Sequence, residues 1–258
     1  MNLLFIGDIF GRPARNAVKK LLPDLVRKEK IDLVVANGEN LSAGIGMTEK
    51  NYLEMIKGGI DYFTSGNHIW DKRDFVPVLA DKKTKVLRPA NYPDAVPGRG
   101  LAEIEVLGRK IVLVNLLGQV FIGPNLKSPF ETLENIIKDH PDQTIIVDFH
   151  AEATSEKCAL FKHFDGRVAA IIGTHTHVQT NDLQISDKKT AFISDVGMVG
   201  VSDSVIGADK NLIVEGFLTQ MPIRVEVPRG EVIFNAVIIE TGLDNTVKSV
   251  KLVNERVG

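Results

Sequence analysis

Up to His177 the chain alternates short apolar runs with amphipathic stretches. The short runs have the length of buried strands, and the longer stretches carry apolar residues at the three- and four-residue spacing of a helix. The pattern predicts strands over residues 2–6, 31–36, 60–64, 144–149 and 168–172, and helices over residues 13–30, 48–57 and 154–164. Pro23 lies inside the first helical pattern, where it predicts a kink or a break.

Local signals predict further turns and helix ends. Leu101–Val106 and Lys110–Leu116 flank a Leu-Gly-Arg turn, which predicts a β-hairpin. Thr48 is expected to cap its helix, and Ser128 opens a capping box with proline at the first helical position, so a helix starts there. The segment 88–100 contains several prolines and glycines and predicts a long loop.

The part of the chain after Thr190 is rich in strand-forming residues. We expect strands over residues 191–194, 223–227, 232–239 and 247–253, with a tight turn at residues 228–230. Repeated strand–helix units followed by consecutive strands indicate an α/β protein with a mixed sheet and a second sheet packed on it. No repeat or interdomain linker is evident, so residues 1–258 are expected to form a single domain.

Composition narrows the classes of partner. The 258 residues are 44% hydrophobic and 25% charged, as in an ordinary globular protein, and the formal net charge is −2. No broad basic surface for nucleic acid or for an acidic membrane is therefore expected. A small phosphorylated substrate remains compatible with this charge, because bound cations can supply positive charge locally.

The chain carries no sign of export or membrane insertion. Its one cysteine, Cys158, lies among apolar residues at helical spacing and is interpreted as a buried, inert thiol, which suits a reducing cytosol. The apolar N-terminus lacks the basic region and length of a signal peptide, and no apolar run approaches the ~18 residues of a membrane span. These features predict a cytoplasmic protein.

Polar side chains collect where the buried strands end. The residues at these positions are Asp8, Glu39, Asn40, Asn67, His68, His150, His175 and His177. Each alone is a weak signal, because turns often follow strands. Together they are harder to dismiss, since they include four of the six histidines and the ends of such strands line up along one edge, where ligands bind. His140 and His163 lie near helix ends and are interpreted as structural.

His175 and His177 carry a geometric prediction. Residues two apart on a regular strand point to the same face, with Thr176 on the other, so both imidazoles can reach a shared site. A ligand role for Thr176 would exclude the two histidines. The histidines are preferred, because neutral imidazole suits Mn, Fe and Zn.

This set of side chains fits a two-metal phosphoesterase. Two divalent ions about 3.5–4 Å apart clamp the attacking and leaving oxygens of a displacement at phosphorus, and they need a bridging carboxylate, terminal ligands and a bound hydroxide. Glu39 suits the bridge and Asp8 a terminal position, while Asn40 and Asn67 offer carbonyl oxygens and the remaining histidines offer nitrogen. His68 follows Asn67 directly and can stand outside the metal shell to protonate the leaving alkoxide.

The motifs resemble a known family. The segments GDIFGRPAR, GEN, GNH, VDFHAEATSEK, GTHTHVQTND and DVGMVG occur in the order found in calcineurin-like metallophosphoesterases, and they most resemble the YmdB-like bacterial branch, in which GEN replaces the superfamily's GD. The resemblance covers nearly the whole chain. It implies an αββα sandwich of two mixed β-sheets flanked by helices.

The resemblance also implies roles for the site residues. Asp8, Glu39, Asn40 and His177 would hold one metal, whereas Glu39, Asn67, His150 and His175 would hold the other, with His68 as the general acid. It implies hydrolysis of phosphodiesters, with 2′,3′-cyclic nucleotides as the substrate class. Iron or manganese would be the metal, and the protein would form a homo-oligomer, a dimer or tetramer.

One position departs from the wider superfamily. Its first motif is Asp-x-His, whereas this chain has Asp8-Ile9-Phe10, so the first metal loses an imidazole that Phe10 cannot replace. Asn40 is expected to fill the gap, as in the YmdB-like branch. The first site would then be richer in oxygen and would favour Fe or Mn over Zn.

Two other functions compete with the phosphodiesterase hypothesis. A signalling protein could bind a nucleotide through the same metals without turnover, although the presence of His68 argues for a proton donor. A flavodoxin- or Rossmann-like domain would explain the strand pattern, but Gly7 and Gly11 do not form the G-x-G-x-x-G dinucleotide motif.

Overall fold

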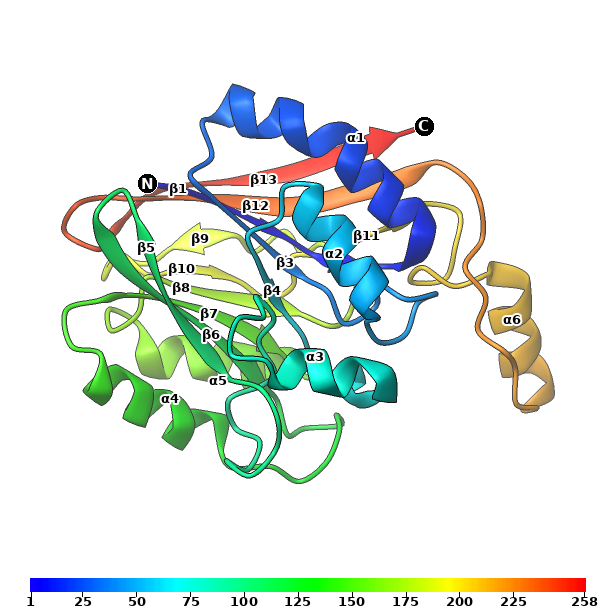
Figure 1. The fold of residues 1–258 in the computed structure, drawn as a ribbon, viewed down its shortest axis with the longest axis horizontal. Coiled ribbons are helices and arrows are strands. Elements are labelled where there is room, and N and C mark those ends of the chain that lie inside the picture. The colour runs from blue at the N-terminus through cyan, green and yellow to red at the C-terminus, as the bar shows by residue number, and fades with distance from the viewer.

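Two β-sheets pack face to face, with helices on their outer surfaces, in a computed structural model that describes all residues from Met1 to Gly258 (Figure 1). The seven-stranded sheet contains β1 (Asn2–Ile6), β2 (Asp8–Ile9), β3 (Leu33–Asn37), β4 (Tyr62–Thr64), β11 (Met198–Val201), β12 (Val232–Thr241) and β13 (Val247–Val257). The six-stranded sheet contains β5 (Leu101–Val106), β6 (Arg109–Leu117), β7 (Thr144–His150), β8 (Ala170–Thr174), β9 (Gln184–Ile185) and β10 (Ala191–Ile193).

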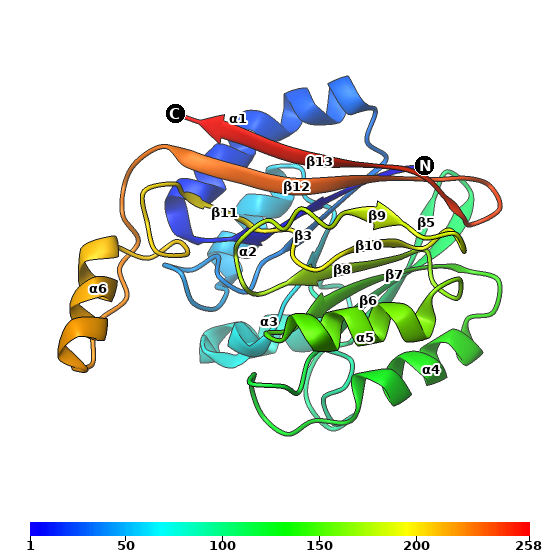
Figure 2. The ribbon, with the colours of Figure 1, turned by 180° about the vertical axis from the view of Figure 1, so that it is seen from behind.

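The helices lie on opposite sides of this pair of sheets. They are α1 (Gly11–Glu29), α2 (Glu49–Lys57), α3 (Val76–Ala80), α4 (Pro129–Asp139), α5 (Thr154–Phe164) and α6 (Lys210–Thr219), with short 3-10 turns η1 (Asn67–Trp70) and η2 (Arg73–Phe75). Helices α1 and α2 cover the seven-stranded sheet, whereas α4 and α5 cover the six-stranded sheet (Figures 1 and 2). Helix α6 projects from the body of the molecule in both views.

Three apolar clusters account for the layers. In β1, Leu3 and Phe5 belong to the cluster between the sheets, whereas Leu4 and Ile6 belong to the cluster beneath α1 and α2. The third cluster joins the six-stranded sheet to α4 and α5. Because both faces of the central strands are buried, these strands are apolar throughout instead of alternating with polar residues.

The fold confirms the predicted αββα sandwich and excludes a flavodoxin- or Rossmann-like domain, which has only one sheet. The predicted strands before His177 and the hairpin of β5 and β6 are present, with ends shifted by one or two residues. Both predicted caps form, since Thr48 accepts a hydrogen bond from the backbone N–H of Asn51 and Ser128 accepts one from Glu131. The segment 88–100 contains no helix or strand, as expected.

The prediction of a break at Pro23 is wrong, because α1 runs without interruption from Gly11 to Glu29. Pro23 is exposed, so the backbone carbonyl that loses its partner can be hydrated. Leu22 and Leu25 on either side are buried and hold the helix against the sheet.

The prediction for residues 223–227 is also wrong, because this segment forms no strand, and the helix α6 before it was not predicted. The place beside β12 is taken by β11, which pairs Val199 with Phe234. Asp209 starts α6 by accepting hydrogen bonds from the backbone of Asn211 and Leu212. None of the helices combines the length and apolarity needed to cross a lipid bilayer.

Candidate metal centre

Both sheets deliver their predicted site residues to the same edge. Strands β1, β3 and β4 run parallel in the seven-stranded sheet, and β7 and β8 run parallel in the six-stranded sheet. Their carboxyl ends bring Asp8, Glu39, His150 and His175 together from across the interface between the sheets, and Asn67 follows Gly66, whose backbone lies against His150 and Glu39. The sequence-based expectation of a common edge therefore holds, although two sheets supply the residues rather than one.

The first group of side chains, here called the histidine half, consists of His150 and His175, together with Asn67, which the sequence resemblance assigns to it. The Nε2 atom of His150 lies 3.0 Å from Oε1 of Glu39 and 3.0 Å from Nδ1 of His175. The ligand atoms of Glu39, His150 and His175 all lie within 4.8 Å of one another, which suits a single cation. Glu39 and His150 are buried, whereas His175 is half-buried.

The second group, here called the aspartate half, consists of Asp8, Asn40 and His177. An Asp8 carboxylate oxygen lies 3.8 Å from Nε2 of His177 and 3.4 Å from Nδ2 of Asn40. The Asn40 amide also lies 3.3 Å from Nε2 of His177 and 3.5 Å from Oε1 of Glu39. Glu39 therefore contacts members of both halves, the position expected of a bridging carboxylate.

Each of the three histidines has one ring nitrogen held by an oxygen atom. Nδ1 of His177 lies 2.7 Å from the carbonyl oxygen of Ile206, and Nε2 of His175 lies 3.0 Å from Oε2 of Glu152. Nδ1 of His150 lies 2.9 Å from the Thr174 hydroxyl. Such partners fix the ring orientation and tautomer and leave the other nitrogen free to bind a metal.

The buried carboxylate of Asp148 supports His150 through the hydroxyl of Thr174. The Thr174 hydroxyl donates a 2.7 Å hydrogen bond to Asp148, so it accepts the proton that His150 presents at Nδ1. Asn37, the last residue of β3, also donates to Asp148 at 3.1 Å. Burial raises the pKa of Asp148 to about 7. Asp148 and Asn37 were not predicted, although Asp148 lies two residues before His150 on β7 and so shares its face.

The segment after β8 corrects the prediction for the two histidines. β8 ends at Thr174, and His175 and His177 adopt φ angles of 105° and 68°, outside the range of a regular strand. The alternation argument is therefore wrong, and the two rings reach different halves of the centre. Asp195 holds the segment by accepting hydrogen bonds from the backbone and hydroxyl of Thr176 at 2.9 and 2.8 Å.

Asp195 is a further residue that the sequence interpretation missed. It is buried and lies 3.0 Å from Nζ of Lys157, and it follows β10 in the position that Asp8 and Glu39 occupy after their strands. The rule that located the other residues at strand ends would therefore have found it. Its carboxylate points to Thr176 and Lys157, so it anchors the histidine segment.

Electrostatics in the buried centre favour a cation. Burial opposes charge on His150, but the carboxylate of Glu39 overrides this effect and raises the pKa of His150 to about 9. Burial likewise opposes charge on Glu39, yet His150 lowers the pKa of Glu39 to about 2. Burial and the neighbouring His150 lower the pKa of His175 to about 3, which keeps its imidazole neutral.

Two observations test the fit of a metal ion. The Oδ1 atom of Asn67 is buried and has no hydrogen-bond partner, which is costly unless a cation completes its surroundings. A Cβ atom on Gly66 would lie 2.2 Å from Cδ2 of His150 and 2.5 Å from Oε2 of Glu39, so only glycine permits this close approach. Carboxylate oxygen, amide oxygen and neutral imidazole together suit a first-row divalent metal.

His68 lies at the rim of the centre, and its ring is outside both halves. Its backbone N–H donates a 3.0 Å hydrogen bond to Oε2 of Glu39, and its Nδ1 lies 2.6 Å from Asp71. The side chain is 32% exposed, so its Nε2 side can face solvent or a substrate. The other two histidines lie outside the centre. His140 contacts the carbonyl oxygen of Ile136. His163 packs against the rings of Phe130 and Phe164.

Phe10 occupies the place of the missing histidine of the first motif. Its ring packs edge-on against His177, with the two centroids 5.6 Å apart. Cβ atoms on Gly44 and Gly207 would lie 2.6 and 2.5 Å from its ring, so Phe10 fills the space beside the aspartate half. The aspartate half therefore has one histidine, as the sequence indicated.

Two packed mixed sheets with this set of carboxylates, amides and histidines at one edge define a metallophosphoesterase. The Haemophilus influenzae NAD nucleotidase shares the fold, with a TM-score of 0.57 at 17% identity over 99% of this chain and 55% of that chain. The family model for YmdB-like proteins matches residues 4–253. The chain belongs to the YmdB-like family.

Two relatives match the chain over nearly its whole length. The 2′,3′-cyclic-nucleotide 2′-phosphodiesterase of Bacillus subtilis (strain 168) is 42% identical over 254 residues, which cover 98% of this chain and 95% of that protein. A crystal structure of a hypothetical protein from Thermus thermophilus has a TM-score of 0.94 at 36% identity and covers 99% of both chains.

Proposed function

We propose that this protein hydrolyses the cyclic phosphodiester of 2′,3′-cyclic nucleotides at a two-metal centre. The observation that carries the proposal is the arrangement around Glu39, where two groups of ligand atoms meet at one buried carboxylate. The partnerless Oδ1 atom of Asn67 supports the presence of a cation. The name of the B. subtilis relative supports the substrate class.

The two halves would each hold one ion. Asp8, Asn40 and His177 would hold the first, Asn67, His150 and His175 the second, and Glu39 would lie between them. Ions in these positions would neutralise charge on the phosphate and lower the pKa of bound water. We propose iron or manganese, because the aspartate half offers more oxygen than nitrogen.

His68 is proposed to protonate the leaving oxygen. The hydrogen bond from its backbone to Glu39 fixes its position relative to the ligands. Asp71 accepts a hydrogen bond from Nδ1, which leaves the other proton of an imidazolium at Nε2. A donor in this position lets the alkoxide depart as an alcohol, a contribution of typically 10²- to 10⁴-fold in rate.

The test compares two variants on 2′,3′-cyclic AMP. Glu39→Gln is expected to abolish turnover and to lower the metal content, because the bridging charge is lost. His68→Ala is expected to lower kcat by about 10²-fold or more while the metal content stays at the wild-type level. His163→Ala is the matched control, since His163 lies outside the centre. Full activity in Glu39→Gln would contradict the two-metal proposal.

The same experiment separates catalysis from a role as a nucleotide-binding signalling protein. A pure binder would retain metal and bind the cyclic nucleotide, but neither the wild type nor His68→Ala would turn it over. Measurable wild-type turnover that depends on His68 excludes this alternative.

We further propose that the protein is a homo-oligomer that assembles through α6 and acts in the cytoplasm. Val214, Phe217 and Leu218 lie at helical spacing on α6, and Met221 follows the end of the helix; their exposed fractions are 49, 75, 80 and 67%. α6 has no buried residue and projects from the body (Figure 1). Neighbouring Ile206, which is 51% exposed, extends this apolar stripe. A second copy offers the same stripe, which is self-complementary about a two-fold axis.

Light scattering tests the assembly. Replacing Phe217 and Leu218 by Glu is expected to reduce the molar mass to that of a monomer. Leu243→Glu is the control, because Leu243 is 92% exposed at a hairpin tip far from α6 in sequence. An unchanged mass in the double variant would contradict assembly through α6.

A further inference from the structure

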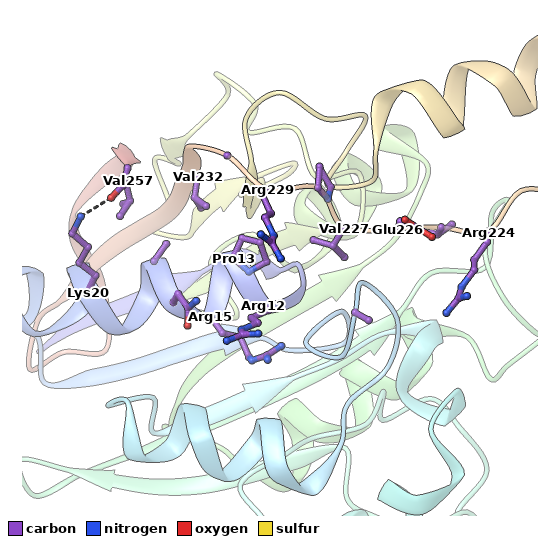
Figure 3. Close-up of a pocket in the computed structure, with 17 residues that line it drawn as sticks. Arg12, Pro13, Arg15, Lys20, Arg224, Glu226, Val227, Arg229, Val232 and Val257 are labelled. Carbon is purple, nitrogen blue, oxygen red and sulfur yellow. Dashed lines mark hydrogen bonds between the residues drawn. The ribbon is translucent and has the colours of Figure 1, made fainter.

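A basic groove lies outside the candidate metal centre. A cavity of about 930 Å³ separates the first half of α1 from the segment 224–232, and none of the eight candidate site residues lines it (Figure 3). Its basic residues are Arg12, Arg15, Lys20, Arg224 and Arg229, and its only acidic residue is Glu226. The rest of the chain carries more acidic than basic residues, so this groove is a local concentration of positive charge.

Most of this charge has no partner within the protein. Arg15 pairs with Glu54 at 2.9 Å, and Lys20 donates to the carbonyl oxygen of Gly258 at 2.6 Å. Arg12, Arg224 and Arg229 make no ion pair and no side-chain hydrogen bond. In Figure 3, Arg229 reaches across Pro13 toward the start of α1, where Arg12 lies. An anion bound in the groove would offset the repulsion among these unpaired guanidinium groups.

The lining of the groove indicates the chemistry of that anion. Guanidinium groups match phosphate oxygens in a planar, two-pronged geometry. No aromatic side chain lines the cavity, so it offers no platform on which a base could stack. Its basic side chains spread along the groove from Lys20 at one end to Arg224 at the other (Figure 3), which suits several phosphates along a chain better than a single ion. Contacts of this kind position a nucleic-acid backbone without reading its sequence.

The groove and the metal centre share a wall. The chain passes from Asp8 through Phe10 to Arg12, and the backbone N–H of Gly11 donates a 2.9 Å hydrogen bond to the carbonyl of Asn40. The ring of Phe10 contacts His177 on the side of the centre. A Cβ atom on Gly11 would lie 3.0 Å from Val227, which lines the groove. One tight turn therefore separates the two sites.

We propose that this groove binds the phosphodiester backbone of an oligonucleotide whose terminal phosphate ester enters the metal centre. The inference rests on the proposed phosphodiesterase function and extends its substrate class from mononucleotides to RNA ends. The formal net charge of −2 excludes a broad nucleic-acid surface but not a confined one. A basic groove on an otherwise acidic molecule concentrates the field at the site where the substrate must arrive.

Binding is measured first, without turnover. The probe is a fluorescein-labelled single-stranded RNA ten-mer with a 3′-phosphate, added to the metal-loaded protein and followed by anisotropy. The double variant Arg12→Gln, Arg229→Gln is expected to bind at least about tenfold more weakly, with a salt slope smaller by about 0.7 for each arginine removed. The matched control is Arg27→Gln, Arg167→Gln, which removes two exposed arginines that pair with Asp24 and Glu134.

Turnover then separates the two proposals. The double variant is expected to lower kcat/KM about tenfold for a ten-mer that ends in a 2′,3′-cyclic phosphate, and to leave 2′,3′-cyclic AMP unaffected. If the protein turns over 2′,3′-cyclic AMP but does not prefer the ten-mer, the proposal that the groove binds an oligonucleotide is wrong and the phosphodiesterase proposal stands. If the protein binds RNA through the arginines but turns over neither substrate, the phosphodiesterase proposal is wrong and the groove proposal stands.

A competition experiment separates a nucleic-acid backbone from a free anion. Inorganic phosphate and pyrophosphate are titrated against the labelled ten-mer, and both are expected to compete only at far higher concentration than unlabelled RNA. Competition at equal concentration would assign the groove to a free phosphate and overturn the proposal. Light scattering on the double variant confirms that its oligomeric state equals that of the wild type, because the groove lies close to α6 in the chain.

Discussion

The two halves of the candidate metal centre differ in how firmly the fold holds them. In the histidine half, His150 lies 3.0 Å from both Glu39 and His175 and rests on the Thr174–Asp148 pair. In the aspartate half, the contacts among Asp8, Asn40 and His177 span 3.3 to 3.8 Å.

The difference indicates unequal affinity of the two halves for metal. A site whose ligands already converge loses little entropy when a cation binds, whereas a looser site must be drawn together. We therefore expect the histidine half to fill first and to hold its metal more tightly. The aspartate half, with more oxygen and only one histidine, is expected to exchange metal more readily.

The largest effect is expected from His150→Ala. This change removes the nitrogen at the centre of the histidine half and leaves the buried Glu39 carboxylate without its imidazole partner, so turnover is expected to fall by about 10³-fold or more. His177→Ala is expected to remove only the weaker metal. Elemental analysis of dialysed protein checks the prediction, with His140→Ala as the control. Equal loss of metal from both variants would contradict the proposal that the histidine half holds its metal more tightly.

A smaller effect is expected from Glu152→Gln. Glu152 lies 3.0 Å from Nε2 of His175, and its carboxylate orients the ring that presents Nδ1 to the histidine half. Removing such a partner typically lowers metal affinity by 10- to 100-fold. Competition with a metal chelator measures the change. Glu103→Gln is the control, because Glu103 faces His140, which lies outside the centre, at 3.6 Å. If both variants retain wild-type affinity, the position of His175 is fixed by Asp195 and the backbone alone.

The contrast between the halves also shows how far the sequence could predict the centre. The strand-end rule located all eight candidate residues, because the carboxyl ends of parallel strands must meet at an edge. Their ligand roles remain a prediction, and so does the single domain over residues 1–258. The family and the two-sheet fold are confirmed.

Other features depended on tertiary contacts that local pattern does not encode. The segment of His175 and His177 leaves the strand geometry because Asp195, from a later strand, holds Thr176. Residues 223–227 have strand-forming side chains, but β11 already occupies the place beside β12. Pro23 interrupts a helical hydrogen bond only on the exposed side of α1, so packing of Leu22 and Leu25 outweighs it.

A modest change in metal preference is expected from Phe10→His. The imidazole would stand beside His177 and give the aspartate half a second nitrogen, which shifts its preference from manganese or iron toward zinc. We expect a change of about tenfold in relative affinity. Phe10→Leu is the control, because it loses the aromatic packing without adding a ligand. A zinc preference that rises equally in both variants would show that packing, not the added nitrogen, sets the metal.

The smallest effect concerns the pH dependence of stability. Without metal, the folded pKa of His150 is about 9, above its ordinary value of 6.5, so its pairing with Glu39 stabilises the fold fully below pH 6.5 and is lost as the pH rises through 9. Asp148 acts in the same direction, because its folded pKa of about 7 lies above 3.8 and the fold therefore favours its protonated form. Glu39 sets the acid limit, since its folded pKa of about 2 gives stability above pH 4.5 that is lost toward pH 2.

Metal reverses this dependence, because a cation needs a deprotonated His150 and so stabilises the fold more as the pH rises. In the metal-free protein the depressed pKa of His175, about 3, opposes the loss of stability with rising pH, because it adds stability as the pH rises toward 6.5, but between pH 5.5 and 9 its effect is smaller than those of His150 and Asp148 together. Metal-free protein is therefore expected to melt a few degrees lower at pH 9 than at pH 5.5, and the gain in Tm on adding Mn²⁺ is expected to be larger at pH 9. In His177→Ala the metal-free difference should persist, since the histidine half is intact, whereas in His150→Ala it should shrink to the part that Asp148 contributes below about pH 7. Melting curves that respond to pH equally in both variants would mean that the pairing of Glu39 with His150 does not distinguish the two halves.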